Sequence, residues 1–197
     1  MFDALNRRMR FAGLSLLGPL LAAIGCQQGA VETASSSSGP QSPAERGQYL
    51  VTIAGCNDCH TPFVLGPNGP EPDMSRMLSG HPESARLSPP PQFSSDWMLI
   101  GSSTFTAFSG PWGVSYAANL TPDENTGIGI WDEQMFIGTI RNGRHMTNGR
   151  PLLPPMPWHW YKEMTDEDLQ AIYAYLRSIP PVSNRVPEPV EPAGPAR

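Results

Sequence analysis

The pentapeptide Cys56-Asn57-Asp58-Cys59-His60 constrains this chain more than any other stretch. Its C-x-x-C-H spacing is typical of covalent c-type haem attachment. Two thiols at this separation add across the two vinyl groups of a haem, and the histidine directly after them is placed to bind the iron. Cys26 is the remaining cysteine and lies far from the motif, so no network of disulfides competes for Cys56 and Cys59.

Two other kinds of site use similar cysteine spacing. A thioredoxin-like dithiol also contains C-x-x-C, but it accompanies a βαβ pattern, and this sequence has no strand-rich unit of that kind. A zinc site needs about four nitrogen or sulfur ligands, and the adjacent Cys59 and His60 are poorly placed to share one ion. We therefore expect one haem c per chain, bound through Cys56, Cys59 and His60.

Composition restricts the remaining choices. The chain has 197 residues, 39% of them hydrophobic, with 23 prolines and 19 glycines. These values are typical of one small globular domain with long, proline-stiffened loops and disordered ends. The formal net charge is −5 and Lys162 is the one lysine. Because the sequence has no basic patch, we do not expect it to bind nucleic acid.

Residues 1–25 have the pattern of a secretory signal peptide. Three arginines precede an apolar run, Phe11–Ile24, which is too short for a comfortable membrane span. The run ends in Ala23-Ile24-Gly25-Cys26, which resembles a bacterial lipobox. We expect export to the periplasmic side and a lipid anchor on Cys26, followed by a flexible tether over residues 26–42. The alternative is an ordinary signal peptide with an incidental cysteine.

Three helices are predicted. The first begins at Pro43, with Ser42 as its N-cap and Glu45 completing a capping box. The second has Asp132 as its N-cap, runs through Arg141 and ends at Asn142-Gly143. The third begins after Thr165 and ends before Pro180-Pro181, and its apolar residues recur every three or four positions. They are Leu169, Ile172, Tyr173, Leu176 and Ile179.

Residues 61–118 form a long proline-rich insertion. The prolines argue against long helices there. Trp97–Ile100 and Thr104–Phe108 are candidate short strands, and we expect a hairpin around Gly101-Ser102. His81 is expected at the surface.

Residues 114–184 resemble the haem domains in the cytochrome c subunits of bacterial membrane-bound alcohol and gluconate dehydrogenases. The resemblance rests on Asn119-Leu120-Thr121-Pro122-Asp123, the following Thr126-Gly127-Ile128-Gly129-Ile130-Trp131, a short helix, Met156-Pro157-Trp158 and the last helix. It extends more weakly to residue 43. Those subunits have three C-x-x-C-H motifs, whereas this chain has one.

The resemblance implies an all-α class I cytochrome c fold over residues 43–184, with residues 185–197 as a disordered tail. In that class a glycine lets the first and last helices cross closely and an aromatic residue packs at the crossing. Gly47 and Tyr49 match these positions.

Met156 is the expected sixth ligand of the iron. The prolines around it stiffen its loop and lower the entropy cost of holding a weak thioether ligand, and its position also fits the family. Met146 is the next candidate, and His145 or His159 would give bis-histidine ligation. Trp131 and Arg141, with Arg144 beside it, are candidate partners of the haem propionates.

We expect one-electron transfer rather than catalysis. The expected partners are redox proteins, either a dehydrogenase or a terminal oxidase, together with a membrane reached through the lipid on Cys26. One alternative is a haem-binding subunit of a larger dehydrogenase or oxidase complex. Another is a haem enzyme or gas sensor in which the distal methionine can be displaced.

Overall fold

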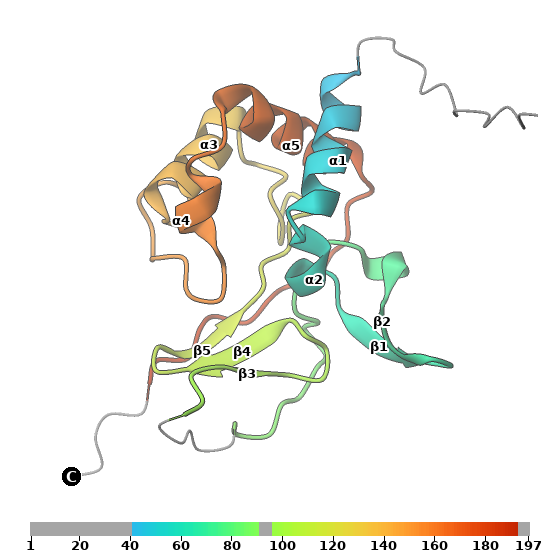
Figure 1. Cartoon of the computed structure of the whole chain (residues 1–197), viewed down its shortest axis with the longest axis vertical. Helices are drawn as coiled ribbons and strands as arrows, with labels where there is room; N and C mark the ends of the chain where they lie inside the picture. Colours follow the sequence, from blue (N-terminus) through green and yellow to red (C-terminus); the bar gives the residue numbers. More distant parts are fainter. Residues whose placement is uncertain (1–40, 91–95, 193–197) are drawn as a thin grey trace, which may run out of the picture. The chain divides into compact units, whose positions relative to one another are not determined.

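The computed structural model describes residues 41–90 and 96–192. The expected signal peptide and Cys26 lie outside the described residues, as does most of the tether. Within the described part, α1 (Pro43–Ile53) and α5 (Asp166–Ser178) pack against each other (Figure 1). No helix in this part of the chain is long and apolar enough to cross a membrane.

Both of these helices begin as the sequence predicts. The Ser42 side chain accepts the Glu45 backbone N–H, and the Glu45 carboxylate accepts the Ser42 N–H at 2.8 Å. Thr165 caps α5 by accepting the Asp168 N–H at 3.1 Å. Arg46 of α1 then pairs with Asp168 of α5 at 3.0 Å. The caps set where the two helices begin, and the ion pair joins one helix to the other.

Gly47 lies at the helix crossing, where a Cβ would collide with the Ala171 carbonyl. The predicted role of this glycine therefore fits the structure. Tyr49 does not pack at the crossing, because it is 51% exposed and lies beside the Arg46 guanidinium. The aromatic residue against Gly47 is Tyr175 of α5.

Three further helices complete the helical part. The attachment motif forms the short helix α2 (Cys56–His60). α3 (Glu133–Asn142) is capped by Asp132 and ends at Gly143, which adopts the left-handed conformation at φ 61°. α4 (Trp158–Tyr161) follows the Met156 loop. Buried residues of α1, α3 and α5, including Val51, Phe136 and Leu169, form one core with Leu78 and Ile128.

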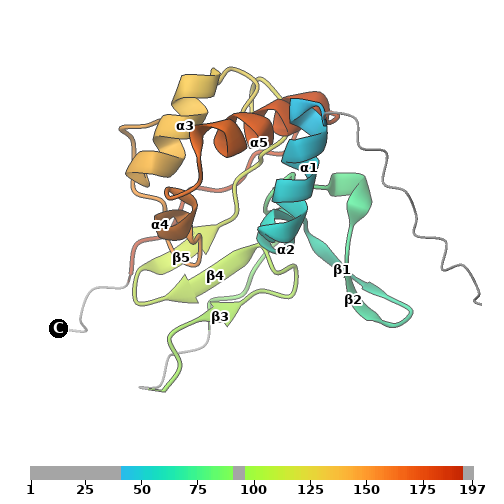
Figure 2. The ribbon, with the colours of Figure 1, turned by 45° about the horizontal axis from the view of Figure 1, so that its top comes forward.

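The expectation of an all-α fold is wrong. β1 (Phe63–Gly66) and β2 (Gly69–Pro72) form a hairpin that projects from the helices (Figure 2). A second antiparallel sheet contains β3 (Ile100–Gly101), β4 (Ala107–Gly110) and β5 (Gly113–Tyr116), in that order. A single helical turn, η1 (Met74–Arg76), follows β2 along the chain. Prolines and glycines prevent helix across the insertion, and short hairpins satisfy its backbone hydrogen bonds instead.

The predicted hairpin is present between β3 and β4, but its strands lie later than expected, with Ile100 opposite Ser109. The prediction that His81 lies at the surface is wrong. His81 is 1% exposed, and its Nδ1 lies 2.9 Å from the Thr106 hydroxyl.

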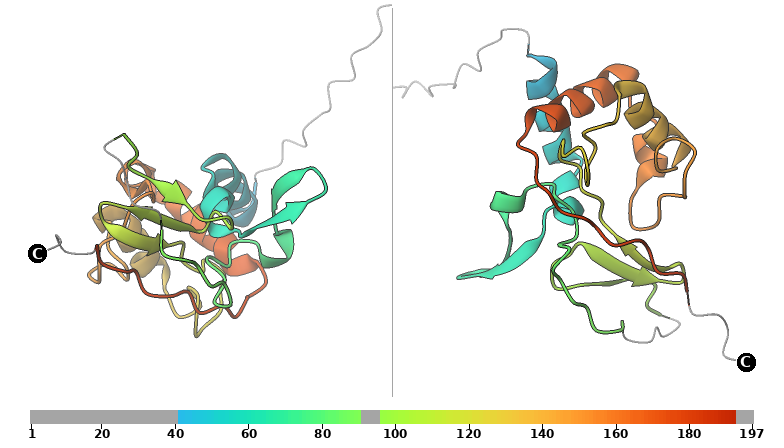
Figure 3. Two further views of the ribbon diagram at one scale, coloured as in Figure 1. Left: turned by 90° about the horizontal axis from the view of Figure 1, so that it is seen from below. Right: turned by 180° about the vertical axis from the view of Figure 1, so that it is seen from behind.

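The chain after α5 returns to the second sheet (Figure 3). Asn184 is buried and bonds the Ser79 and His81 carbonyls and the Glu83 N–H. Val190 then forms a bridge with Val114, through two hydrogen bonds of 2.8 and 2.9 Å. We call residues 180–192 the C-terminal strap. Within the tail that was expected to be disordered, Arg185, Glu188 and Val190 contact Glu83, Arg150 and Val114. Residues 193–197 lie outside the described residues.

Candidate haem site

Helix α2 presents the attachment motif to the interior. Gly55 precedes it in the left-handed conformation, at φ 69°, which turns the chain sharply between α1 and α2. Cys56 and Cys59 are partly buried free thiols, and His60 is 8% exposed. All three residues line the same cavity. The motif is thus folded and turned inward.

A hydrogen bond fixes the tautomer of His60. Its Nδ1 lies 2.8 Å from the Ala118 carbonyl oxygen. Because a carbonyl only accepts, Nδ1 must donate, and the lone pair remains on Nε2. Metal-binding histidines commonly donate their second ring N–H in this way, which fixes the ring and makes it a better ligand. His60 is therefore prepared to bind iron through Nε2.

The cavity is lined mostly by apolar side chains and opens to solvent at its mouth. Its walls come from the core helices, the second sheet and the segment around Met156. Apolar lining residues include Val51, Phe108, Leu120, Ile128, Phe136 and Leu169. A large flat apolar group with two reactive vinyls fits these walls and the two thiols.

Met156 lines this cavity together with His60. Its loop is anchored because the Ser115 hydroxyl donates to the Pro154 carbonyl and the Met156 N–H bonds Leu153. The structure thus brings the predicted axial pair to one cavity. Met164 also lines it. The sequence-based prediction overlooked Met164, which directly precedes the cap of α5.

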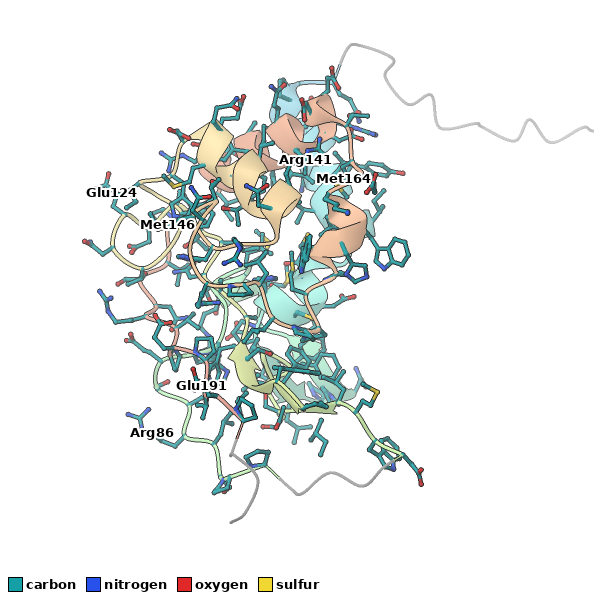
Figure 4. The ribbon with its side chains drawn as sticks, turned by 90° about the vertical axis from the view of Figure 1, so that its left-hand side faces the viewer. Arg86, Glu124, Arg141, Met146, Met164 and Glu191 are labelled. Carbon is teal, nitrogen blue, oxygen red and sulfur yellow. The ribbon has the colours of Figure 1, made fainter. Side chains whose placement is uncertain are left out.

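Met146 lies apart from the cavity. It is 41% exposed and occupies the tip of the turn 143–152, which is closed by the bridge between Arg144 and Pro151. Figure 4 shows Met146 well separated from Met164 and Arg141. The described structure gives Met146 no place on the cavity wall.

The two candidate histidines differ. His145 lines the cavity and meets the Trp131 ring edge-on, with centroids 5.3 Å apart. His159 is exposed on α4, and its ring lies tilted against the Trp160 ring, with centroids 4.9 Å apart. Among the alternatives to Met156, His145 is therefore within the site and His159 is not.

Of the candidate propionate partners, one lies on the cavity wall and another does not. Trp131 lines the cavity, whereas Arg141 bonds the Lys162 carbonyl and pairs with Asp166 at 2.6 Å. The structure does not bring Arg141 to the cavity wall. Arg150 lies there instead. Its position across the turn from His145 could not be read from a sequence pattern.

The thiols do not have the electrostatics of a redox dithiol. Burial raises the pKa of Cys56 to about 11 and also raises the pKa of Cys59. Reactive dithiols instead have a lowered thiol pKa. Within residues 41–90 and 96–192, no group of three or more His, Cys, Asp or Glu side chains is arranged to hold a metal ion.

Comparisons with known proteins agree with this geometry. The gluconate 2-dehydrogenase cytochrome c subunit of Pantoea cypripedii is 40% identical over 140 residues, which is 71% of this chain and 24% of that subunit. The fructose dehydrogenase cytochrome subunit of Gluconobacter japonicus is 30% identical over 144 residues, 73% of this chain and 23% of that subunit. The chain is similar to the cytochrome c subunits of bacterial dehydrogenases. The resemblance expected from the sequence is confirmed.

A longer match involves the cytochrome c subunit of the quinone-dependent alcohol dehydrogenase of Gluconobacter oxydans. It is 25% identical over 191 residues, or 95% of this chain and 33% of that subunit. The chain thus spans about a third or less of the length of these three relatives. No protein-family model matches it. The attachment motif, the apolar cavity and the cytochrome relatives together indicate covalently bound haem c as the cofactor.

Proposed function

We propose that this protein is a single-haem cytochrome c that transfers one electron at a time, with a dehydrogenase as one redox partner. The observation that carries the proposal is that α2 and Met156 line one apolar cavity in which the Ala118 carbonyl fixes His60. One C-x-x-C-H motif in the sequence supports one haem. The cytochrome subunit names of the relatives support the dehydrogenase partner.

When bound, haem iron supplies a one-electron couple between its ferric and ferrous forms. Cys56 and Cys59 would hold the macrocycle covalently, and His60 and Met156 would bind its iron. Methionine–histidine ligation favours a higher reduction potential than bis-histidine ligation. The apolar walls act in the same direction, because a medium of low dielectric disfavours the additional charge of the oxidised form.

Export and lipid anchoring are part of the same proposal, and the N-terminal pattern ending at Cys26 supports them. A Cys26→Ser variant should lose membrane association and any incorporated fatty acid, because its thiol is the proposed lipid attachment site. Membrane fractionation with labelled palmitate measures this. An unlabelled wild-type protein would favour the ordinary signal peptide.

The test of electron transfer is an optical spectrum of protein expressed with haem-maturation machinery, recorded oxidised and then reduced. We expect covalent haem, low-spin spectra in both states and no carbon monoxide binding by the ferrous form at neutral pH. High-spin spectra with rapid carbon monoxide binding would favour a haem enzyme or gas sensor. Absence of covalent haem would overturn the proposal.

A further inference from the structure

The carbonyl that fixes the His60 ring belongs to a segment that is itself held by the insertion. Ala118 supplies this carbonyl, and segment 117–120 around it runs beside segment 78–81. Two backbone hydrogen bonds of 2.9 Å join the segments, from the His81 N–H to Ala117 and from the Leu120 N–H to Leu78. The direction of the Ala118 carbonyl therefore depends on how closely segment 78–81 approaches.

Gly80 lies inside segment 78–81 and contacts both partners of the His60 ring bond. Its N–H donates to the His60 carbonyl at 2.7 Å. A Cβ at Gly80 would lie 2.7 Å from the Ala118 carbonyl oxygen, which is the atom that accepts the His60 Nδ1–H. Gly80 also has φ 78°, in the left-handed region that favours glycine. Any other residue here would push the Ala118 carbonyl away.

The C-terminal strap holds Gly80 through the two residues beside it. The buried Asn184 side chain donates to the Ser79 carbonyl at 2.7 Å and to the His81 carbonyl at 2.9 Å. These bonds clamp the backbone on either side of Gly80. A single side chain of the strap thus fixes the segment that contacts the Ala118 carbonyl.

Asn119 ties the other segment to the strap. It directly follows Ala118, is 4% exposed, and donates from its side chain to the Val182 carbonyl at 2.8 Å. Its Oδ1 accepts the Thr121 N–H at 3.0 Å. Both segments that meet at the Ala118 carbonyl are therefore bonded to the strap.

A hydrogen bond at the second ring nitrogen of a histidine changes the donor strength of the first. A close acceptor makes the imidazole more basic and a better ligand. A more basic ligand stabilises the oxidised form of an iron site more than the reduced form, and second-shell hydrogen bonds are a known control of haem potentials. Loss or lengthening of the bond from His60 to Ala118 should therefore raise the reduction potential.

We propose that Gly80 is a positioning residue for the iron ligand. Clamped by Asn184, it lets the Ala118 carbonyl lie against the His60 Nδ1–H and thereby lowers the reduction potential of the site. The inference rests on the proposed function, because it concerns the potential of the same haem. It gives the strap, which follows the last helix, a part in setting that potential.

The experiment is a spectroelectrochemical measurement of the potential of Gly80→Ala holoprotein. We expect the ratio of oxidised to reduced protein at the wild-type midpoint to change about tenfold in favour of the reduced form. For one electron this corresponds to an increase of about 59 mV in the potential. Asn184→Ala should raise the potential by less, because the clamp is lost but no atom is added beside Ala118.

Gly69→Ala is the matched control for the left-handed conformation. Gly69 has φ 119°, but no atom lies within 4 Å of the position that its Cβ would take. This variant should keep the wild-type potential even though its backbone is strained. Ser183→Ala, at the exposed residue before Asn184, is the control for the strap and should also keep the potential.

Proton exchange provides a readout that a general loss of stability would not reproduce. NMR of the ferrous holoprotein follows exchange of the His60 Nδ1–H with water. This exchange should be about tenfold faster in Gly80→Ala than in wild type, measured relative to the backbone N–H groups of α5. Equal acceleration at His60 and throughout α5 would indicate global destabilisation instead and would contradict the positioning role.

A folded Gly80→Ala holoprotein with the wild-type potential would overturn the proposal. If Gly80→Ala gives no folded holoprotein, Asn184→Ala decides, and an unchanged potential in that variant would overturn it. Equal shifts in Gly69→Ala and Gly80→Ala would do the same, because strain alone would then explain them. A wild-type protein without covalent haem or a reversible couple would overturn the proposed function itself, which distinguishes the two failures.

Discussion

Met156 and Met164 are both thioethers on the cavity wall, and one axial position can take only one of them. We expect Met156→Ala to abolish the weak far-red absorption band of methionine-bound ferric haem, because the anchored proline loop positions this side chain. Met164→Ala and Met146→Ala should retain the band. A band lost in Met164→Ala and kept in Met156→Ala would reassign the ligand.

His81 gives a prediction about acid stability. Burial lowers the pKa of His81 below its ordinary value of 6.5. Below that value the unfolded chain takes up a proton that the folded protein resists, so the free energy of unfolding should fall as the pH drops below about 6.5. The loss is limited to about 1.4 kcal/mol per pH unit for one group.

Chemical denaturation at pH 7.5 and pH 5.5 measures this loss. His81→Gln should show a smaller difference between the two conditions than wild type, whatever its stability at either one. The exposed His159→Gln variant is the control and should keep the full difference. Equal differences in wild type and His81→Gln would contradict the assignment.

Among the elements, the crossing of α1 and α5 is the most sensitive to packing. Gly47→Ala should lower the free energy of unfolding by about 1–3 kcal/mol, because its Cβ would collide with the Ala171 carbonyl and the helices would have to separate. Gln48→Ala, an exposed neighbour on the same helix, should change it by less than about 0.5 kcal/mol. Thermal denaturation of the holoproteins measures both changes, and equal effects would show that the close crossing is unimportant.

The elements also show what could be predicted from the sequence. Helices α1, α3 and α5 have caps and apolar spacing that are local, so Ser42, Asp132 and Thr165 marked their starts. The strands of the insertion have at most four residues each. Such segments are too short to show a period, and their pairing depends on contacts far along the chain. This is why the all-α expectation failed.

In the candidate site, too, features set by local sequence could be predicted and features set by distant contacts could not. The attachment motif and the proline-flanked Met156 are local patterns, and both line the cavity. Arg150, Met164 and the burial of His81 depend on how distant segments meet. No local pattern distinguishes Arg150, on the cavity wall, from Arg141, which pairs with Asp166.

For the molecule as a whole, the C-terminal strap ties the insertion to the helices through Asn184. Asn184→Ala should lower the free energy of unfolding by roughly 2–4 kcal/mol, because two buried carbonyls and the Glu83 N–H lose their partner. Ser183→Ala, an exposed neighbour, should have little effect. Denaturant titration of both variants provides the measurement. A neutral Asn184→Ala would mean that water replaces the lost bonds.

The strap also has a consequence for the order of biosynthesis. Cys56 and Cys59 leave the ribosome long before Met156 and Pro189, which complete the opposite wall of the cavity. The attachment residues lie within five consecutive positions, whereas the lining of the pocket extends from Val51 to Pro189. Attachment can therefore precede enclosure, and the newly bound haem would then serve as the surface on which the late segments fold.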